Sequence, residues 1–218
     1  MALCSRSLTA PLFLLGAIAA SGQQSAPIVQ PGAPGQPNRF LTETTVRIPP
    51  KPPFGADVEF MQGMIMHHSQ AVDMVALLRT HGKSPVLKSF GEKISVSQTD
   101  EIGFMKRWLE SRGKATSMEM DHSKMSPADM KSMNMLMPGM LTPEQMTALT
   151  KARGAQFDHL FLTGMIQHHG GALTMVDELF STPGAGQDPV LFDFATDIEN
   201  TQSAEIKIMR GMLDKEKQ

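Results

Sequence analysis

Residues 60–68 read Phe-Met-Gln-Gly-Met-Ile-Met-His-His, and residues 161–169 read Phe-Leu-Thr-Gly-Met-Ile-Gln-His-His. The chain therefore repeats itself at an offset of 101 residues, and a second block repeats at an offset of 104. In that block Phe90, Ile94, Gln98, Glu101, Ile102, Met105 and Leu109 correspond to Phe194, Ile198, Gln202, Glu205, Ile206, Met209 and Leu213. The offset changes between the blocks, where the second repeat has a longer loop.

Apolar residues in each block recur every three to four positions, as they do on the buried face of a helix. A half-buried strand would alternate with period two, and no block does so. Each repeat therefore predicts a helical hairpin, and two hairpins predict an all-α fold, a four-helix bundle. We expect Gly63 and Gly164 to permit close helix approach, and Asp57 and Asp158 to be first-turn acids favoured by the helix dipole.

The rest of the chain divides by composition. Residues 1–21 carry Arg6 and an apolar run with small residues after it, which predicts a signal peptide; an uncleaved anchor is the alternative. Residues 22–56 contain eight prolines and predict a disordered leader. We expect the bundle over residues 57–218, with hairpins at 57–111 and 156–218 and a Met-rich connection at 112–155. The protein is then periplasmic or secreted, with no membrane span after signal cleavage.

Composition excludes several classes of function. The formal net charge of −2 argues against nucleic-acid binding through phosphate neutralisation. The sequence shows no Ser/His/Asp arrangement and no phosphate-binding glycine loop. The chain has 19 methionines, and this number points to thioether sulfur, used in packing or in metal binding.

Polar residues interrupt the apolar stripes at one level of the predicted bundle. An antiparallel hairpin places His68 level with Gln98 and Met64 level with Glu101, and the second hairpin repeats this with its equivalent residues. On a helical wheel His67 lies near the centre of the stripe and His68 about 100° away, so one ligates while the other orients it or contacts solvent. This layer is either a hydrogen-bonded plug or a metal site. The candidate metal ligands in the bundle are Met64, His67, His68, Glu101, Met165, His168, His169 and Glu205.

The connection supplies a second candidate site. Met118, Met120, His122 and Met125 stand among polar residues, where exposed thioethers have little packing value. Thioether sulfur with imidazole selects Cu(I). We therefore expect a Cu(I) site in the connection and a separate site in the bundle that also accepts Cu(II) or Zn.

The pattern Phe60-Met61-x-Gly63-Met64-Ile65-x-His67-His68, repeated from Phe161, resembles the signature of domain-of-unknown-function family 305. The block from Gln98 to Leu109 is similar to the second helix of that family, and the resemblance covers about residues 55–218. It implies a ferritin-like four-helix bundle and, by analogy with exported members, copper binding in copper tolerance. The family's Met and His copper residues would map to Met64, His67, His68, Met165, His168 and His169. The match departs at Gly211, where the first repeat has Arg107.

Three functions follow as hypotheses. The first is a non-enzymatic copper-binding protein that sequesters the metal or transfers it to a copper transporter or chaperone. The second is a ferritin-like two-metal oxidase, which usually needs Glu-x-x-His pairs and further Glu ligands, whereas only Glu101 and Glu205 lie in the seam. The third is a structural bundle with a buried polar layer that binds no metal.

Overall fold

The computed structural model describes residues 28–30, 35–41, 54–117 and 137–216. They separate into two units, divided between Pro50 and Lys51. In the first unit, β1 (Ile28–Gln30) pairs antiparallel with β2 (Arg39–Leu41), with Val29 opposite Phe40. The sequence predicts a disordered leader over residues 22–56, and this short hairpin is an exception to it. Its two strands contain no proline, so every residue in them can donate a hydrogen bond to the ladder.

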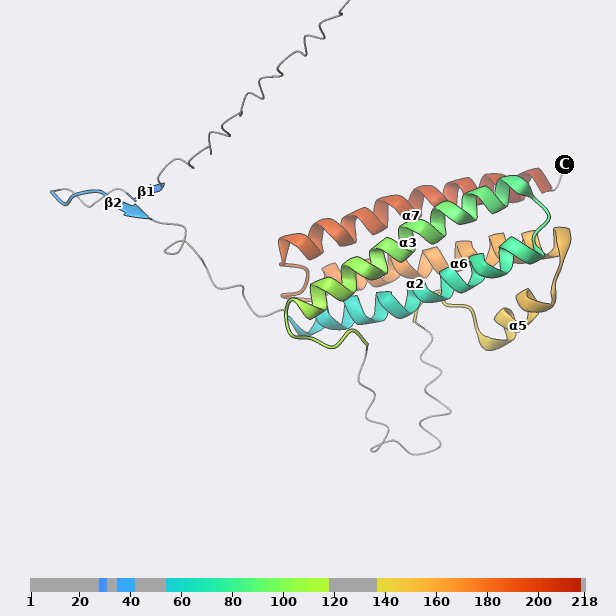
Figure 1. Ribbon diagram of the computed structural model, residues 1–218, viewed down its shortest axis with the longest axis horizontal. Helices are drawn as coiled ribbons and strands as arrows, with labels where there is room; N and C mark the ends of the chain where they lie inside the picture. The colour runs from blue at the N-terminus through green and yellow to red at the C-terminus, as the bar shows by residue number, and fades with distance from the viewer. Residues whose placement is uncertain (1–27, 31–34, 42–53, 118–136, 217–218) are drawn as a thin grey trace, which may run out of the picture. The chain divides into compact units, whose positions relative to one another are not determined.

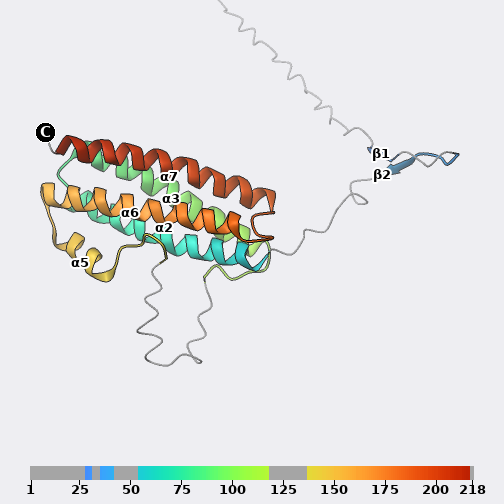
Figure 2. The same cartoon turned by 180° about the vertical axis from the view of Figure 1, so that it is seen from behind.

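The second unit is the predicted all-α bundle (Figures 1 and 2). Its long helices are α2 (Gly55–His81), α3 (Pro85–Glu110), α6 (Gly154–Ser181) and α7 (Pro189–Glu216). Helix α2 packs on α3 and α6 packs on α7, and the two hairpins meet through α2 and α6. No helix in the described part of the chain is long and apolar enough to cross a membrane.

Local sequence signals set where the helices begin. Ser84 caps α3, since its Oγ accepts from the N–H of Leu87 at 3.2 Å, and Pro85 follows at the first helical position. The short helix α5 (Pro143–Lys151) begins with a capping box between Thr142 and Gln145. It packs on the outside of α6.

One aspartate from each hairpin accepts hydrogen bonds from the loop of the other hairpin. The Asp158 carboxylate accepts from the N–H groups of Lys83 and Ser84, both at 2.9 Å, in the loop between α2 and α3. In the same way Asp57 accepts from the N–H of Gly186 at 2.7 Å, in the loop between α6 and α7. The expectation that Asp158 is a first-turn acid is wrong. Helix α6 begins at Gly154, so Asp158 lies beyond the first turn, and its carboxylate bonds to the loop of the other hairpin. These matched bonds indicate a pseudo-two-fold relation between the hairpins.

Helices α2 and α6 run antiparallel, because the end of α2 at Gly82 bridges to the start of α6 at Gly154. Two apolar clusters fill the bundle, one on each side of a polar layer at the middle of these helices. The first cluster includes Met64, Met105 and Met175, and the second includes Met74, Met165 and Met209. The four histidines of the repeated motif lie between them, with no solvent exposure.

Candidate metal centre

The four histidines form one buried layer, which we call the His layer (His67, His68, His168 and His169). Each Nε2 atom lies within hydrogen-bond distance of a carbonyl or carboxylate oxygen, which accepts the bond. His67 meets the carbonyl of Pro138 at 3.0 Å, and His168 meets the carbonyl of His67 at 2.9 Å. His68 meets the carboxylate of Glu101 at 2.6 Å, and His169 meets that of Glu205 at 2.7 Å. Every Nε2 atom therefore carries the ring proton. In a neutral ring Nδ1 then presents a lone pair, and none of the four Nδ1 atoms has a hydrogen-bond partner among the described residues.

The pairing across each hairpin is one turn away from the expected register. His68 bonds to Glu101 and not to Gln98, and His169 likewise bonds to Glu205. A helical side chain leans toward the N-terminus of its own helix, so the Glu101 head group reaches back to the level of Gln98. The expected alternative in which His68 contacts solvent is wrong, because its side chain is fully buried.

Two glutamines beside the His layer are buried without hydrogen-bond partners. Gln98 and Gln202 are each 2% exposed, and neither side-chain amide has a hydrogen-bond partner in the described part of the chain. Each lies one turn before the glutamate that holds a histidine. The layer therefore contains buried amide oxygens in addition to the four bare ring nitrogens, and such groups are costly unless a ligand or water satisfies them.

The central pair of the layer is His67 and His168, whose ring centroids are 3.8 Å apart. Burial, with the neighbouring His68, lowers the pKa of His67 to about 3. Burial, followed by His67 and His169, lowers the pKa of His168 well below its usual value. Both rings are therefore neutral at physiological pH, which is the form that ligates metals.

A segment of the connection, residues 137–141, covers the layer from one side; we call it the closing segment. Besides the bond from His67 to Pro138, the Gln70 amide donates to the Leu141 carbonyl at 3.0 Å and accepts from its N–H at 2.7 Å. On α6 the segment crosses Gly171, where an added Cβ would lie 1.8 Å from the Pro138 oxygen. The symmetry-related positions Gln70 and Gly171 thus both serve to seat this segment.

The sequence pattern predicts close helix approach at Gly63 and Gly164. An added Cβ at Gly164 would meet Leu141 at 3.0 Å and Met74 at 3.3 Å, which are side chains and not the backbone of a neighbouring helix. The close backbone contact lies at Gly171, which the repeat does not mark because its counterpart is Gln70. Gly139, with φ +76°, supplies the turn on the other side of that contact.

Thioethers flank the His layer on both sides. Met64 and Met165 have no exposure, and each lies one turn before its histidine pair. Four more buried methionines recur as symmetry pairs that the sequence interpretation did not assign to the site: Met74 with Met175, and Met105 with Met209. Their recurrence in both repeats is the signal that would have found them. Met118, Met120, His122 and Met125 lie outside the described residues.

The side chains of the His layer meet one requirement of a metal site and lack another. A histidine that ligates a metal usually donates its other ring N–H to a carboxylate or a carbonyl, and all four histidines already do so. The glutamates thus act as orienting partners of His68 and His169 in this structure. Among the described residues, no three side chains of the His, Cys, Asp and Glu types are placed to share one ion. A site here needs further donors from thioether sulfur or amide oxygen.

The surface beside Glu101 differs from the equivalent surface of the other hairpin. A cavity of about 480 Å³ between α3 and α7 is lined by Glu101 with three aspartates: Asp100, Asp193 and Asp197. The equivalent positions by the repeat are Ala204, Ser89 and Lys93. The two His–Glu pairs therefore make matched contacts, but the surroundings of Glu101 are strongly acidic and those of Glu205 are not.

Comparisons with known proteins agree with this architecture. No curated protein matches the chain significantly. Among solved structures, a DUF305 fragment from Deinococcus radiodurans is similar at 27% identity and a TM-score of 0.63, over 76% of this chain and 99% of that one. A DUF305 protein from Streptomyces coelicolor, predicted to be secreted, is similar at 28% identity and a TM-score of 0.60, over 73% and 93%.

A third solved structure is CopM in its Cu(I)-bound form, with 27% identity, a TM-score of 0.55 and coverage of 73% of this chain and 96% of that one. CopM is also known in Cu(II)-bound and silver-bound forms. The family model of a domain of unknown function, DUF305, matches residues 57–213. That span takes in both hairpins and the whole His layer, and the chain therefore belongs to the DUF305 family.

Proposed function

We propose that this protein binds copper at the His layer and holds it, or passes it on, in an exported compartment. The observation that carries the proposal is the common state of the four histidines, each with Nε2–H committed to an oxygen and Nδ1 left as a buried lone pair. Hydrogen bonding within a polar plug accounts for the Nε2 atoms. It does not account for four unpartnered Nδ1 atoms, which metal ligation would satisfy.

Copper fits this donor set better than the other common metals. Calcium and magnesium prefer oxygen. A structural zinc site takes four His, Cys or carboxylate ligands on one ion, whereas no three such side chains among the described residues are placed to share one. Imidazole with thioether is the combination that suits Cu(I), and buried methionines stand on both sides of the layer. The copper-bound forms of CopM support the same assignment.

We propose a binding protein and not an oxidase. A two-metal carboxylate centre needs several glutamates that ligate directly, with Glu-x-x-His pairs among them. Here Glu101 and Glu205 each bond to a histidine, and neither belongs to such a pair. Silver has no role in such oxidation chemistry, and the silver-bound form of CopM fits a protein that holds soft ions.

The finer parts of the proposal rest on the sequence. The apolar start of the chain and the relative predicted to be secreted favour export, and transfer would then be to a copper transporter or chaperone. The residues Met118, Met120, His122 and Met125 form the proposed second site, selective for Cu(I). The bundle site would also accept Cu(II).

The test compares copper binding by the wild-type chain with that of His68→Gln/His169→Gln, which removes one ring from each hairpin. Chelator competition should show at least tenfold weaker Cu(I) binding at the bundle, and X-ray absorption should show lost nitrogen scattering. The matched control is His81→Gln/His159→Gln, which changes two histidines outside the layer and should leave affinity unchanged. Unaltered affinity and nitrogen scattering in the first variant would overturn the bundle site.

A second variant separates the two sites. Replacing Met118, Met120 and Met125 with Leu should remove Cu(I) capacity from the connection and leave Cu(II) binding by the bundle intact. Equal loss of both oxidation states in both variants would mean one shared site, and the two-site assignment would be wrong.

A further inference from the structure

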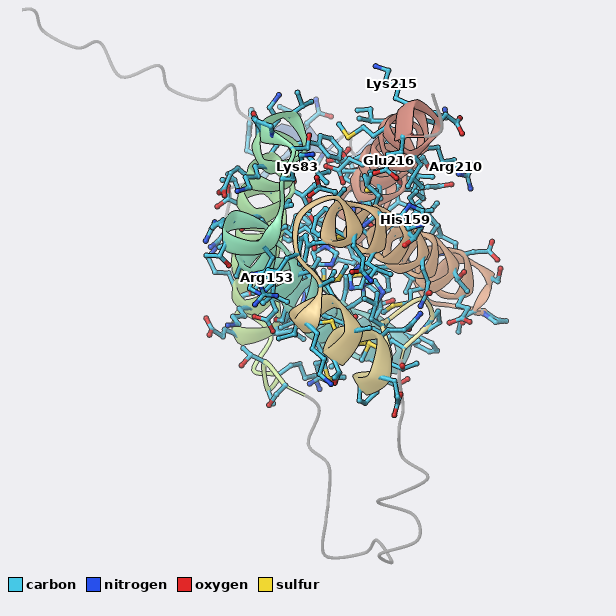
Figure 3. The ribbon with its side chains drawn as sticks, turned by 90° about the vertical axis from the view of Figure 1, so that its right-hand side faces the viewer. Lys83, Arg153, His159, Arg210, Lys215 and Glu216 are labelled. Atoms are coloured by element: carbon cyan, nitrogen blue, oxygen red, sulfur yellow. The ribbon has the colours of Figure 1, made fainter. Side chains whose placement is uncertain are left out.

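The bundle has a cavity of about 830 Å³ at the end where α2 turns into α3 and α7 ends; we call it the terminal pocket. Its floor and walls include Leu87, Leu162 and Met212, and its rim includes Lys207, Lys215 and Glu216. In Figure 3, which looks onto this end, Glu216 of α7 lies beside His159 of α6, and Lys215 lies above both at the outer edge of α7. A cavity of this volume is within the range of sites that take small molecules.

At the opposite end of the bundle, larger and charged side chains occupy several of the repeat-equivalent positions. There Trp108 is 3% exposed, and the Arg112 guanidinium lies 4.0 Å from the centroid of its ring. Arg112 also donates to the carboxylate of Asp188 at 2.6 Å. An indole, a cation stacked on it and an ion pair therefore fill the equivalent space at that end.

The residues at the terminal pocket are smaller or uncharged compared with the repeat-equivalent residues at the opposite end. By the offsets of 101 and 104, the pairs are Phe54 with Ala155, Met61 with Leu162, Arg107 with Gly211, Trp108 with Met212, and Asp188 with Ser84. An added Cβ at Gly211 would meet nothing within 4 Å. The space left by these changes has thus not been refilled by neighbouring side chains.

The charged residues at the rim of the terminal pocket also differ from those at the equivalent positions of the opposite end. Arg112 corresponds to Glu216, which turns away to bond the ring of His159 at 2.9 Å. Lys207 and Lys215 replace Gly103 and Ser111, and both are exposed. Neither lysine has an ion-pair partner within the described residues. Asp158 also lines the pocket, but its two carboxylate oxygens already accept from the N–H groups of Lys83 and Ser84. The rest of the interior is mainly apolar and lies beneath two ammonium groups, which makes it complementary to an anion with an apolar body.

We propose that the terminal pocket binds a hydrophobic monoanion, a carboxylate with an alkyl body. The alkyl chain lies on Leu87, Leu162 and Met212, and the carboxylate lies between Lys207 and Lys215. This site is separate from the His layer and does not depend on copper.

The probe is dodecanoate, used below its micelle concentration and titrated calorimetrically into the metal-free chain. We expect saturable binding at one site, and at least tenfold weaker binding of dodecyltrimethylammonium, which has the same alkyl chain with a cationic head. The variant Gly211→Arg/Met212→Trp fills the pocket with residues that the fold already accommodates at its other end. It should bind dodecanoate at least tenfold more weakly.

A second variant, Lys207→Gln/Lys215→Gln, changes exposed residues only, so it tests the site even if the filled variant does not fold by circular dichroism. It should weaken dodecanoate binding several-fold and abolish the preference over the cation. The matched control, Lys106→Gln on α3, should bind as the wild type does. The proposal is overturned if binding does not saturate, if the cation binds as well as dodecanoate, or if the lysine variant binds dodecanoate unchanged.

Discussion

Acidification should destabilise the metal-free bundle through its buried histidines. Folding holds His67 at a pKa of about 3, because burial and the neighbouring His68 oppose its charged form. In the unfolded chain the pKa of a histidine is near 6.5. The unfolded state therefore binds more protons below that value, and the stability present above about pH 6.5 is lost as the pH falls toward 3.

The size of the effect follows from the two pKa values of His67. Near pH 5 the unfolded imidazole is almost fully protonated, whereas the folded one is almost fully neutral. The difference corresponds to about 1.5 pK units of proton binding, or about 2 kcal/mol lost relative to neutral pH. His168 acts with the same sign, because burial, followed by the neighbouring His67, lowers its pKa too.

The assay is urea unfolding of the chelator-treated chain, followed by circular dichroism near pH 7.5 and near pH 5. The variant His67→Gln should lose about 2 kcal/mol of the difference between the two pH values. The control His159→Gln removes an exposed histidine and should keep the whole difference. A wild-type unfolding free energy that is equal at the two pH values would refute the reasoning, and so would a His67→Gln variant that retains the full difference.

Three further predictions concern named contacts. Gly171→Ala should cost about 1–3 kcal/mol in urea unfolding because its Cβ would collide with the Pro138 carbonyl, whereas Gly170→Ala, whose Cβ would meet nothing, should be neutral or slightly stabilising. Glu101→Gln should leave the unfolding free energy within about 1 kcal/mol and weaken copper binding about 10–100-fold in chelator competition, since the amide no longer holds the His68 tautomer as firmly. Asp158→Asn should lower the unfolding free energy by about 1.5–3 kcal/mol, because it removes the charge from two hydrogen bonds to backbone N–H groups.

The fold could be predicted from the sequence because the pattern of the helical hairpin occurs twice in the chain. Repeated apolar periodicity in two blocks predicts two helical hairpins, and the histidines on those apolar stripes are all buried. The Thr142 capping box is also a local feature, because it depends on residues only three positions apart. These are features in which local chemistry and tertiary structure agree.

The finer geometry of the site was not accessible in the same way. Residue levels alone paired His68 with Gln98, whereas the lean of the side chains along the helix pairs it with Glu101. The bond from His67 to Pro138 was also out of reach, because the two residues are 71 positions apart and no repeat marks the second one. Contacts that break the internal symmetry leave no trace in the pattern that reveals it.

That broken symmetry bears on how the two halves of the site would meet a cation. The pairs His68–Glu101 and His169–Glu205 make the same hydrogen bonds, so their intrinsic chemistry is alike. The field around them differs, because aspartates line the cavity beside Glu101 and a lysine occupies one of the equivalent positions on the other side. Carboxylates raise the local concentration of cations and an ammonium group lowers it. Under the proposed function a copper ion would therefore encounter the His68 side faster than the His169 side, although duplication built both from the same residues.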